Sequence, residues 1–459
     1  MNNALDDAVT GKGLETAFQQ VVLLSSGTVI GYEALARWPA KSVTPLDIIT
    51  HATKTGRLNF LDRACIRSAA QGALRGNSSP GMLLLVNSEP ATACADLAED
   101  ADVMRAAESF RLAFEITERG LLSDPRALLR KLAVLRSLGI AIALDDVGAN
   151  PDSVALLDVV APDILKLDIG LVQRPDRAHA QALAAIVAYR ERTGAVICAE
   201  GIETEEHLQR ALAYGATLGQ GFMFGAPGEL SAKPAVFRWH ETRPRPQSET
   251  GPSVFDIVAA GRTSRTVTGS TVEGLLDDVQ ELAVTAEVPP IVLATLGREE
   301  IGETARRRYR CLAEKSPLVA VFGHDVSADL GDRVRRISLD ATDPLSLELS
   351  IVVLSPDTAV SLVARERDPS QEFSADSDDR LFDVVFTFDR DRAAEAVRSL
   401  LDRPAPTISI HVDPKRRKLA SCTCGWKAKS RRLRFMALGD VAEHRTKTGH
   451  MPVDARLAG

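Results

Sequence analysis

Acidic and amide side chains stand at the ends of short apolar runs in the first half of the chain, where a carboxylate would normally resist burial. The runs "GYEAL", "LLLVN", "LAFEIT", "IAIALDD" and "VICAE" each carry such a residue at or near their end. The run "DILKLD" carries a lysine and an aspartate, and "LGQG" offers a glutamine. The set comprises Glu33, Asn87, Glu115, Asp145, Asp146, Lys166, Asp168, Glu200 and Gln220.

Gathered in one place, these side chains would favour the chemistry of hard divalent cations. Carboxylates held together repel one another unless a cation neutralises them, and oxygen ligands that include an amide carbonyl suit Mg²⁺ or Mn²⁺. The adjacent Asp145 and Asp146 could share two ions, and a pair about 3.5–4 Å apart activates water and clamps a phosphoryl oxygen. Lys166 could orient that water or neutralise developing charge. A single acidic residue after a strand is usually a helix cap, but six strands with this ending favour one site.

A repeated strand–helix pattern over residues 12–235 would position these side chains. The apolar runs alternate with helical stretches such as "PRALLRKLAVLRSLG" and "RAHAQALAAIVAYRERTG". This pattern implies a parallel sheet with helices outside, and about eight strands fit a TIM-like (β/α)8 barrel of the α/β class. Only "SSGT" separates the first two runs, which predicts a hairpin and therefore one antiparallel strand. In such a barrel the carboxyl ends of the strands converge on one face, the usual place for chemistry.

Composition divides the rest of the chain. Residues 236–252 include "ETRPRPQSETGP", whose prolines and polar residues mark a linker. Residues 253–403 again alternate apolar runs with helical stretches, which predicts a second α/β domain. Residues 404–459 form a short basic tail that contains "CTCGW" and "HRTKTGH".

The tail presents two thiols and two imidazoles, a set that suits a tetrahedral structural Zn²⁺. The candidate ligands are Cys422, Cys424, His444 and His450. One residue separates the cysteines instead of the usual two to four, so the spacing departs from common zinc modules. The alternative is a basic, thiol-bearing appendage whose charge and Trp426 contact nucleic acid.

The bulk numbers exclude several classes of protein. A net charge of -7 does not suggest that the chain as a whole binds nucleic acid. No apolar run approaches the roughly 18 residues of a membrane helix, and "MNNALDDAVTGKG" is unlike a signal peptide. Six cysteines without a secretion signal read as reduced thiols. We therefore expect a cytoplasmic protein that does not bind membranes.

The motifs "GYEALARW", "VNSEP", "FEITE", "ALDDVG", "ILKLD", "AEGIET" and "QGFMFGAP" together resemble the EAL domains, phosphodiesterases of cyclic di-GMP. The resemblance covers residues ~12–230, with agreement in motif order and spacing. It implies a TIM-like barrel with one antiparallel strand, a homodimer, and metal-dependent hydrolysis of one phosphodiester bond to give linear pGpG.

The resemblance also implies roles for individual residues. Two Mg²⁺ or Mn²⁺ ions would be held by Glu33, Asn87, Glu115, Asp145 and Asp146. Lys166 would assist the water, Glu200 would complete the catalytic set with Glu33, and Asp168 would support it. Glu203 would brace the loop after the aspartates. The cyclic di-GMP would be contacted by Gln19, Leu35, Arg37 and Gln220.

One stretch departs from the family. The paired aspartates are usually followed by "FGTGYSSL", whereas residues 147–154 read "VGANPDSV". Val147 replaces a phenylalanine, and Pro151 restricts the backbone. Two alternatives to an active enzyme therefore stay open. One is a degenerate EAL domain that binds the nucleotide as a receptor, and the other is a scaffold that acts through protein contacts.

The second domain resembles the DICT domain, a presumed sensory module of signalling proteins. The features that carry this resemblance are "SVFDIV", "LELSIVVLSP" and "RLFDVVFTFDRDRAAEAVRSLL". No catalytic cluster stands out among these residues. The resemblance implies a regulatory domain with an unknown ligand.

Overall fold

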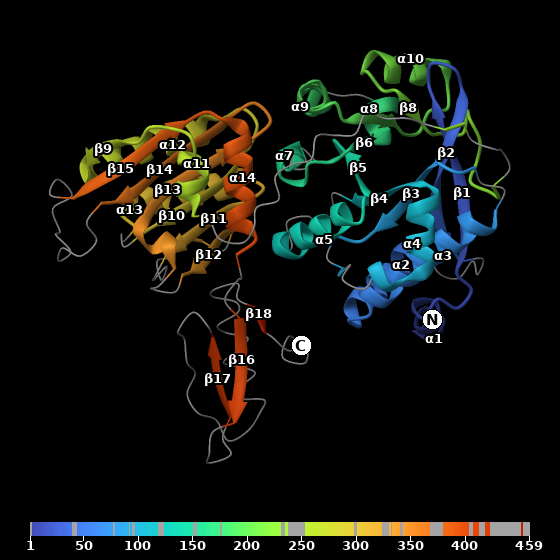
Figure 1. Ribbon diagram of the computed structural model, residues 1–459, viewed down its shortest axis with the longest axis horizontal. Coiled ribbons are helices and arrows are strands. Elements are labelled where there is room, and N and C mark those ends of the chain that lie inside the picture. Colours follow the sequence, from blue (N-terminus) through green and yellow to red (C-terminus); the bar gives the residue numbers. More distant parts are fainter. Residues whose placement is uncertain are drawn as a thin grey trace. The chain divides into compact units, whose positions relative to one another are not determined.

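The computed structural model folds into two compact units, Met1–Gln247 and Ser248–Gly459 (Figure 1). None of the helices among the described residues is long and apolar enough to span a membrane. The structure describes residues 2–38, 44–76, 79–90, 92–93, 97–117, 124–149, 154–174, 177–230, 235–236, 253–297, 301–323, 330–331, 333–339, 343–367, 380–403, 407–412, 418–422 and 451–452.

The first unit contains a closed eight-stranded barrel, as the sequence predicts. Its strands are β1 (Glu15–Leu23), β2 (Thr28–Arg37), β3 (Leu83–Ser88), β4 (Arg111–Thr117), β5 (Ala141–Val147), β6 (Ile164–Leu167), β7 (Val196–Ala199) and β8 (Leu218–Gly219). β1 runs antiparallel to both β2 and β8, and the other neighbouring strands are parallel. The predicted hairpin and single antiparallel strand are therefore confirmed.

Helices cover the outside of the barrel, so its parallel strands are buried on both faces. On β3, Leu83 and Leu85 point into the barrel core, while Leu84 and Val86 pack with the outer helices. This explains why "LLLV" is apolar throughout instead of alternating. The helices are α1 (Asn2–Val9), α2 (Pro45–Lys54), α3 (Leu58–Arg75), η1 (Leu97–Glu99), α4 (Ala101–Ser109), α5 (Pro125–Ser137), α7 (Leu157–Val160), α8 (Ile169–Gln173), α9 (Arg177–Thr193) and α10 (Glu205–Ala213).

The second unit contains a seven-stranded mixed sheet in the order β12-β11-β10-β13-β14-β15-β9. β10, β11 and β12 are parallel to one another, and the remaining pairs are antiparallel. The strands are β9 (Arg265–Thr268), β10 (Ile291–Leu296), β11 (Val319–Gly323), β12 (Val334–Ser338), β13 (Glu348–Leu354), β14 (Ala359–Glu366) and β15 (Leu381–Thr387). This sheet confirms the predicted second α/β domain.

Helices cover both faces of this sheet. α12 (Gly269–Thr285) and α13 (Glu303–Lys315) share one apolar core with alternate residues of β13, including Leu349 and Ile351. α11 (Val254–Ala259) and α14 (Arg390–Leu401) contact each other and the opposite face, to which Glu348 belongs. The short helix η2 (Pro344–Leu347) leads into β13.

The tail contributes a three-stranded sheet of β16 (Thr407–Val412), β17 (Lys418–Cys422) and β18 (Met451–Pro452), in the order β17-β16-β18. Cys422 is the last residue of β17. Cys424, Trp426, His444 and His450 lie outside the described residues, as do positions 237–252 of the expected linker. The zinc site therefore stays a prediction.

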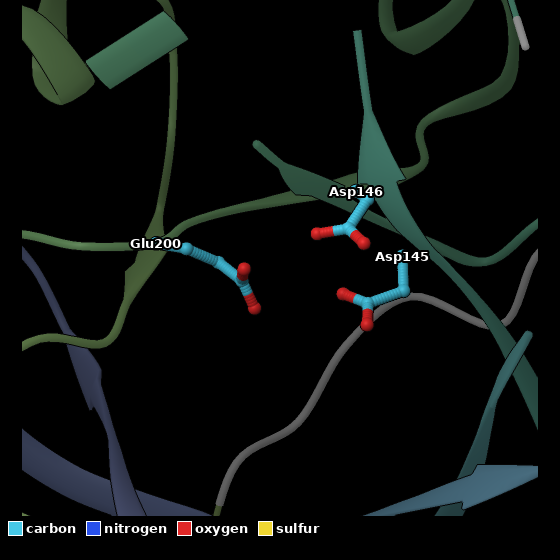
Figure 2. Close-up of side chains that lie close together, drawn as sticks. All are labelled: Asp145, Asp146 and Glu200. Atoms are coloured by element: carbon cyan, nitrogen blue, oxygen red, sulfur yellow. The ribbon is translucent and has the colours of Figure 1, made fainter. Parts of the chain in front are cut away.

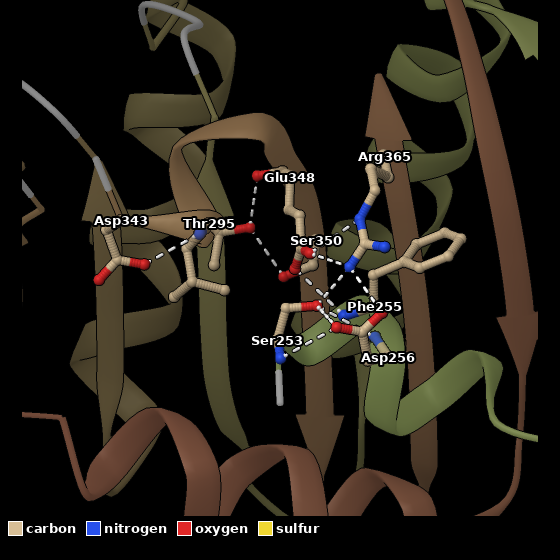
Figure 3. A network of polar contacts seen from close by, with 9 residues as sticks. Ser253, Phe255, Asp256, Thr295, Asp343, Glu348, Ser350 and Arg365 are labelled. Atoms are coloured by element: carbon tan, nitrogen blue, oxygen red, sulfur yellow. Dashed lines mark hydrogen bonds and ion pairs between the residues drawn. The ribbon is translucent and has the colours of Figure 1, made fainter. Parts of the chain in front are cut away.

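A buried ion pair ties α11 to the sheet (Figure 3). Glu348 on β13 is fully buried, and Arg365, its register partner on β14, places Nη2 2.8 Å from Glu348 Oε1. The backbone N–H of Phe255 donates to the other oxygen of Glu348 at 3.1 Å. Arg365 also donates to Asp256 at 2.8 Å and lies over the ring of Phe255. These contacts tie the first helix after residue 252 to β13 and β14.

Replacing Arg365 with methionine should loosen α11. The change leaves the carboxylate of Glu348 buried without its cation, which we expect to cost about 2–3 kcal/mol because the arginine itself is partly exposed. Hydrogen exchange of the α11 amides in the full chain should become faster. The matched control is Arg367→Met, which removes a more exposed pair with Asp383. Equal exchange rates in both variants would contradict the assignment.

Candidate active site

The barrel brings most of the predicted side chains together at the carboxyl ends of its parallel strands. Glu33 stands on β2, Asn87 on β3, Glu115 on β4, Asp145 and Asp146 on β5, and Lys166 on β6. Glu200 directly follows β7, and Gln220 directly follows β8. Carboxylate oxygens of Asp145, Asp146 and Glu200 lie within 4.8 Å of one another. Figure 2 shows these three carboxylates turned toward one another.

Lys166 lies at the centre of this cluster. Its Nζ is 2.6 Å from Glu200, 2.7 Å from Glu115, 2.9 Å from Asp145 and 3.4 Å from Glu33. Burial acts to lower the pKa of Lys166, but the four carboxylates, Asp145 first, hold that pKa well above its ordinary value. The ammonium group therefore stays charged, and it can donate protons in hydrogen bonds but cannot act as a base.

Two amide side chains orient Glu33. Asn87 Nδ2 donates to Glu33 Oε1, and Gln220 Nε2 donates to Oε2, both at 3.0 Å. Burial acts to raise the pKa of Glu33, yet Lys166 and these hydrogen bonds hold it below its usual value. Gln220 lies at the mouth of the barrel and is buried. Its side chain therefore also helps to position Glu33.

A bulge turns both aspartates of β5 toward the mouth. Successive side chains of a regular strand point to opposite faces, which would separate Asp145 from Asp146. The pairing of β5 with β6 shifts register between Leu144 and Val147, and Asp146 has a φ of 56°. Aspartate is among the few residues that tolerate this left-handed conformation. The backbone distortion therefore allows two adjacent carboxylates to face one site.

The end of β7 is held against the end of β8, which fixes the position of Glu200. Ile202 N donates to Gln220 O at 3.0 Å, and Gln220 N donates to Ala199 O at 2.9 Å. Gly221 has a φ of 153°, and a Cβ there would lie 2.1 Å from the Ile202 carbonyl oxygen. Only glycine permits this close approach of the two segments.

The cluster has the charge and the donor set of a divalent cation site. When all five carboxyl groups are ionised, they and the one ammonium group carry four uncompensated negative charges, which two divalent cations would neutralise. Glu115 is fully buried, and its Oε2 has no hydrogen-bond partner among the described residues. Lys166 is close to Glu115 Oε1 and to Asp145, but neither contact has the angles of a hydrogen bond.

The raised pKa values of two carboxyl groups in the cluster are those expected of a cation site without its cations. Burial, and then the neighbouring Glu33, raise the pKa of Glu115 well above its usual value. Burial raises the pKa of Glu200 to about 8. Without cations these carboxyl groups tend to hold protons, which a metal ion would displace. The residues present therefore fit Mg²⁺ or Mn²⁺.

The residues expected to contact a nucleotide lie beside this cluster. Glu33, Leu35 and Arg37 alternate along β2 and so share one face of the strand. Gln19 lies directly opposite Glu33 on β1, with its amide 3.4 Å from Gly225 O. Arg37 is exposed and has no carboxylate partner among the described residues, so its guanidinium can meet a phosphate.

Two predicted residues do not join the cluster in the described part of the chain. Asp168 caps α8 by accepting from Gly170 N at 2.8 Å, which is the ordinary role of an aspartate before a helix. Glu203 is exposed, and the loop it was expected to brace includes residues 150–153, which lie outside the described residues. Val147 is fully buried.

A second buried lysine, which the sequence reading missed, holds the segment after Asn87. Lys131 on α5 donates to Glu89 O at 2.5 Å and lies 3.6 Å from Asp62 on α3. Asp62 in turn accepts from Ser88 Oγ at 3.1 Å and from Glu89 N at 3.0 Å. These residues are far apart in sequence and show no local motif, so only the fold reveals them.

Lys131→Met should weaken cation binding at the carboxylate cluster without abolishing it. Loss of this anchor frees the segment next to Asn87, and groups that orient a ligand typically change metal affinity by about 10–100-fold. We expect a rise of about tenfold in the Mn²⁺ concentration that half-saturates the site, with full occupancy restored by excess Mn²⁺. Lys12→Met, which removes an exposed lysine of the same unit, is the control. An unchanged Mn²⁺ requirement would contradict the anchoring role.

Comparison with known proteins points to one family for each unit. Residues 2–227 match the family model of the EAL domain. Residues 259–367 match that of the DICT domain, described as a sensory domain in diguanylate cyclases and two-component systems. The DICT match thus lies C-terminal to the EAL match, in the order that the sequence predicts.

Individual relatives are similar over the first unit. The cyclic di-GMP phosphodiesterase RocR of Pseudomonas aeruginosa is 30% identical over 227 residues, which cover 46% of this chain and 57% of RocR. The probable cyclic di-GMP phosphodiesterase PdeB of Escherichia coli is 27% identical, over 52% of this chain and 47% of PdeB. The solved PaMucR phosphodiesterase in complex with cyclic di-GMP is 28% identical with a TM-score of 0.42, over 50% of this chain and 97% of that one. The matched region spans between 29% and 57% of the length of the first three curated relatives.

Proposed function

Because residues 2–227 belong to the EAL domain family, we propose that the barrel hydrolyses cyclic di-GMP to linear pGpG with two divalent cations, under the control of the DICT domain. The observation that supports this most strongly is the ring of four carboxylates around Lys166, with Asp146 beside it and with a buried Glu115 oxygen that lacks a hydrogen-bond partner among the described residues. Such a ring is costly unless cations occupy it.

The proposal assigns the cations to Glu33, Asn87, Glu115, Asp145 and Asp146. Bound Mg²⁺ or Mn²⁺ would polarise the phosphoryl group and make a water molecule more acidic. Asn87 donates an amide hydrogen to Glu33 and keeps an amide oxygen as a neutral ligand. Gln220 holds Glu33 from the other side.

The remaining residues would bind the substrate and manage charge. Arg37 would hold a phosphate of the nucleotide, with Leu35 on the same strand and Gln19 on the neighbouring strand β1, opposite Glu33. Lys166 would donate to the attacking water or to the oxygen that gains charge, because its ammonium group is fixed among the carboxylates. Glu200, 2.6 Å from Lys166, would complete the set that orients the water.

Turnover of cyclic di-GMP by the full chain with Mn²⁺ tests the proposal. We expect pGpG as the product, and we expect Glu33→Gln to lower the rate by about a hundredfold or more, since a charged ligand is lost while its shape is kept. Glu108→Gln changes an exposed glutamate on α4 and serves as the control. If the unmodified chain formed no pGpG, or if both variants had the same rate, the proposed enzymatic activity would be refuted.

The second candidate is a cyclic di-GMP receptor that does not cleave its ligand. The sequence of residues 147–154, with valine in place of phenylalanine and with Pro151, favours it. Saturable binding of cyclic di-GMP by the full chain, without pGpG after prolonged incubation with Mn²⁺, would identify the receptor. If the chain neither bound nor hydrolysed cyclic di-GMP, the remaining interpretation would be a scaffold.

A further inference from the structure

A surface cavity of about 530 Å³ lies at one edge of the seven-stranded sheet. Its lining includes Arg262, Arg265, Val267, Leu275, Val384 and Phe386. We propose that this cavity is the ligand site of the sensory domain and that it binds a small organic anion with an apolar, planar body. The volume falls in the range of about 300–1,000 Å³ that is usual for small-molecule sites.

The cavity exists because the edge strand stops early. β9 has only four residues, and its first, Arg265, pairs with Val384 of β15. β15 continues to Thr387, so its last three residues reach beyond the edge strand. The missing length of β9 leaves a space between the end of β15 and the chain that leads into β9.

One wall of the cavity is apolar and aromatic. Val384 is buried in the sheet core, and Val267 and Leu275 pack against that core. Phe386 is 47% exposed, and it contacts the still more exposed Phe388 edge to face, with ring centroids 5.2 Å apart. Exposed aromatic side chains beside a hollow are typical of a binding surface, because a planar ligand would cover them.

The lining of the cavity also carries positive charge. Arg265 is exposed and has no carboxylate contact within the described ranges. Arg262 lies 2.7 Å from Asp389, so its charge is already paired, whereas the guanidinium of Arg265 is left to meet a ligand. A guanidinium binds carboxylate, sulfonate or phosphate oxygens through charge-assisted, often paired hydrogen bonds. The cavity therefore selects a ligand that is anionic at one end and apolar at the other.

This cavity is separate from the carboxylate cluster of the barrel. Its charged side chains are positive, whereas those of the barrel cluster are mostly negative. The inference stands on the geometry of the second unit alone. It goes beyond the proposed phosphodiesterase, and neither the success nor the failure of one decides the other.

Two fluorescent probes of the same shape test the inference on the full chain. Anilinonaphthalene sulfonate has a planar aromatic body with an anionic group, and phenylnaphthylamine has the body without the charge. We expect saturable binding of the sulfonate probe to the unmodified protein. Arg265→Gln should weaken this binding about tenfold, the equivalent of one charge-assisted hydrogen bond, and should leave the neutral probe unchanged.

Matched variants complete the design. Phe386→Ser should weaken the binding of both probes, because it removes the aromatic wall. Arg307→Gln alters an exposed arginine of α13 outside the cavity and should change neither. Since all three positions are exposed, circular dichroism and the melting temperature of each variant should match those of the unmodified chain.

Three results would overturn the inference. The first is the absence of saturable sulfonate binding by the unmodified chain. The second is equal binding by the Arg265→Gln and Arg307→Gln variants. The third is a dimer, seen by analytical ultracentrifugation, that Phe386→Ser dissociates while sulfonate binding increases, because a second copy of the chain would then be the occupant of this surface.

Discussion

Asp146→Asn is expected to lower the turnover of cyclic di-GMP by about a hundredfold or more while the barrel stays folded. Loss of one charged cation ligand removes about 3 kcal/mol of transition-state stabilisation, which corresponds to that factor. Asparagine tolerates the left-handed backbone at this position, so the bulge of β5 should survive. The measurement is the rate of pGpG formation at saturating Mn²⁺, together with the affinity for Mn²⁺, which should also fall.

The control for this variant is Asp163→Asn. Asp163 lies just before β6, at the opposite end of the barrel, where it accepts from Ile142 N. An asparagine oxygen can accept the same hydrogen bond, so turnover should stay near that of the unmodified chain. If Asp146→Asn retained more than about a tenth of the activity, the two aspartates of the bulge would not both serve the reaction.

Lys166→Met is expected to lower the turnover of cyclic di-GMP by about a thousandfold, while Mn²⁺ still binds. The change removes a positive charge that lies 2.6–3.4 Å from four carboxylates, so the cluster should hold divalent cations at least as tightly as before. What is lost is the fixed donor to the water or to the charged oxygen. Without added metal ions the barrel should be destabilised by about 3–5 kcal/mol, because the carboxylates lose the one ammonium partner that they have in the described part of the chain.

Lys131→Met is the matched comparison, since both lysines are fully buried in the same barrel. Excess Mn²⁺ should restore turnover in Lys131→Met and should fail to do so in Lys166→Met. The two variants thus separate a group that acts on the reaction from one that positions a ligand. Recovery of Lys166→Met by Mn²⁺ to within tenfold of the unmodified rate would show that Lys166 only neutralises charge.

The closed barrel and the strand-end positions of its polar side chains could be predicted from the sequence. Apolar runs buried on both faces, such as "LLLV", identify parallel strands, and the carboxyl ends of such strands converge. The short connection "SSGT" after Leu24 identified the antiparallel strand. These features follow from local patterns, which the sequence displays directly.

Other features depend on contacts that no local pattern encodes. A regular strand would send Asp145 and Asp146 to opposite faces, so the bulge could not be read from "ALDD". The hydrogen bond from Gln220 to Glu33 joins residues 187 positions apart, and the anchor of Lys131 joins two helices through Asp62. In the second unit, the edge strands β9 and β12 are short and carry arginines, so they lack the apolar run that marks a buried strand.

The number of Mn²⁺ ions bound per chain tests the central claim most directly. Isothermal titration of the full chain with Mn²⁺ in the presence of cyclic di-GMP measures it, with Asp146→Asn as the comparison. The account predicts two ions per unmodified chain and at most one in the variant. Failure of the unmodified chain to bind Mn²⁺ saturably, or the same number of ions in both proteins, would contradict it.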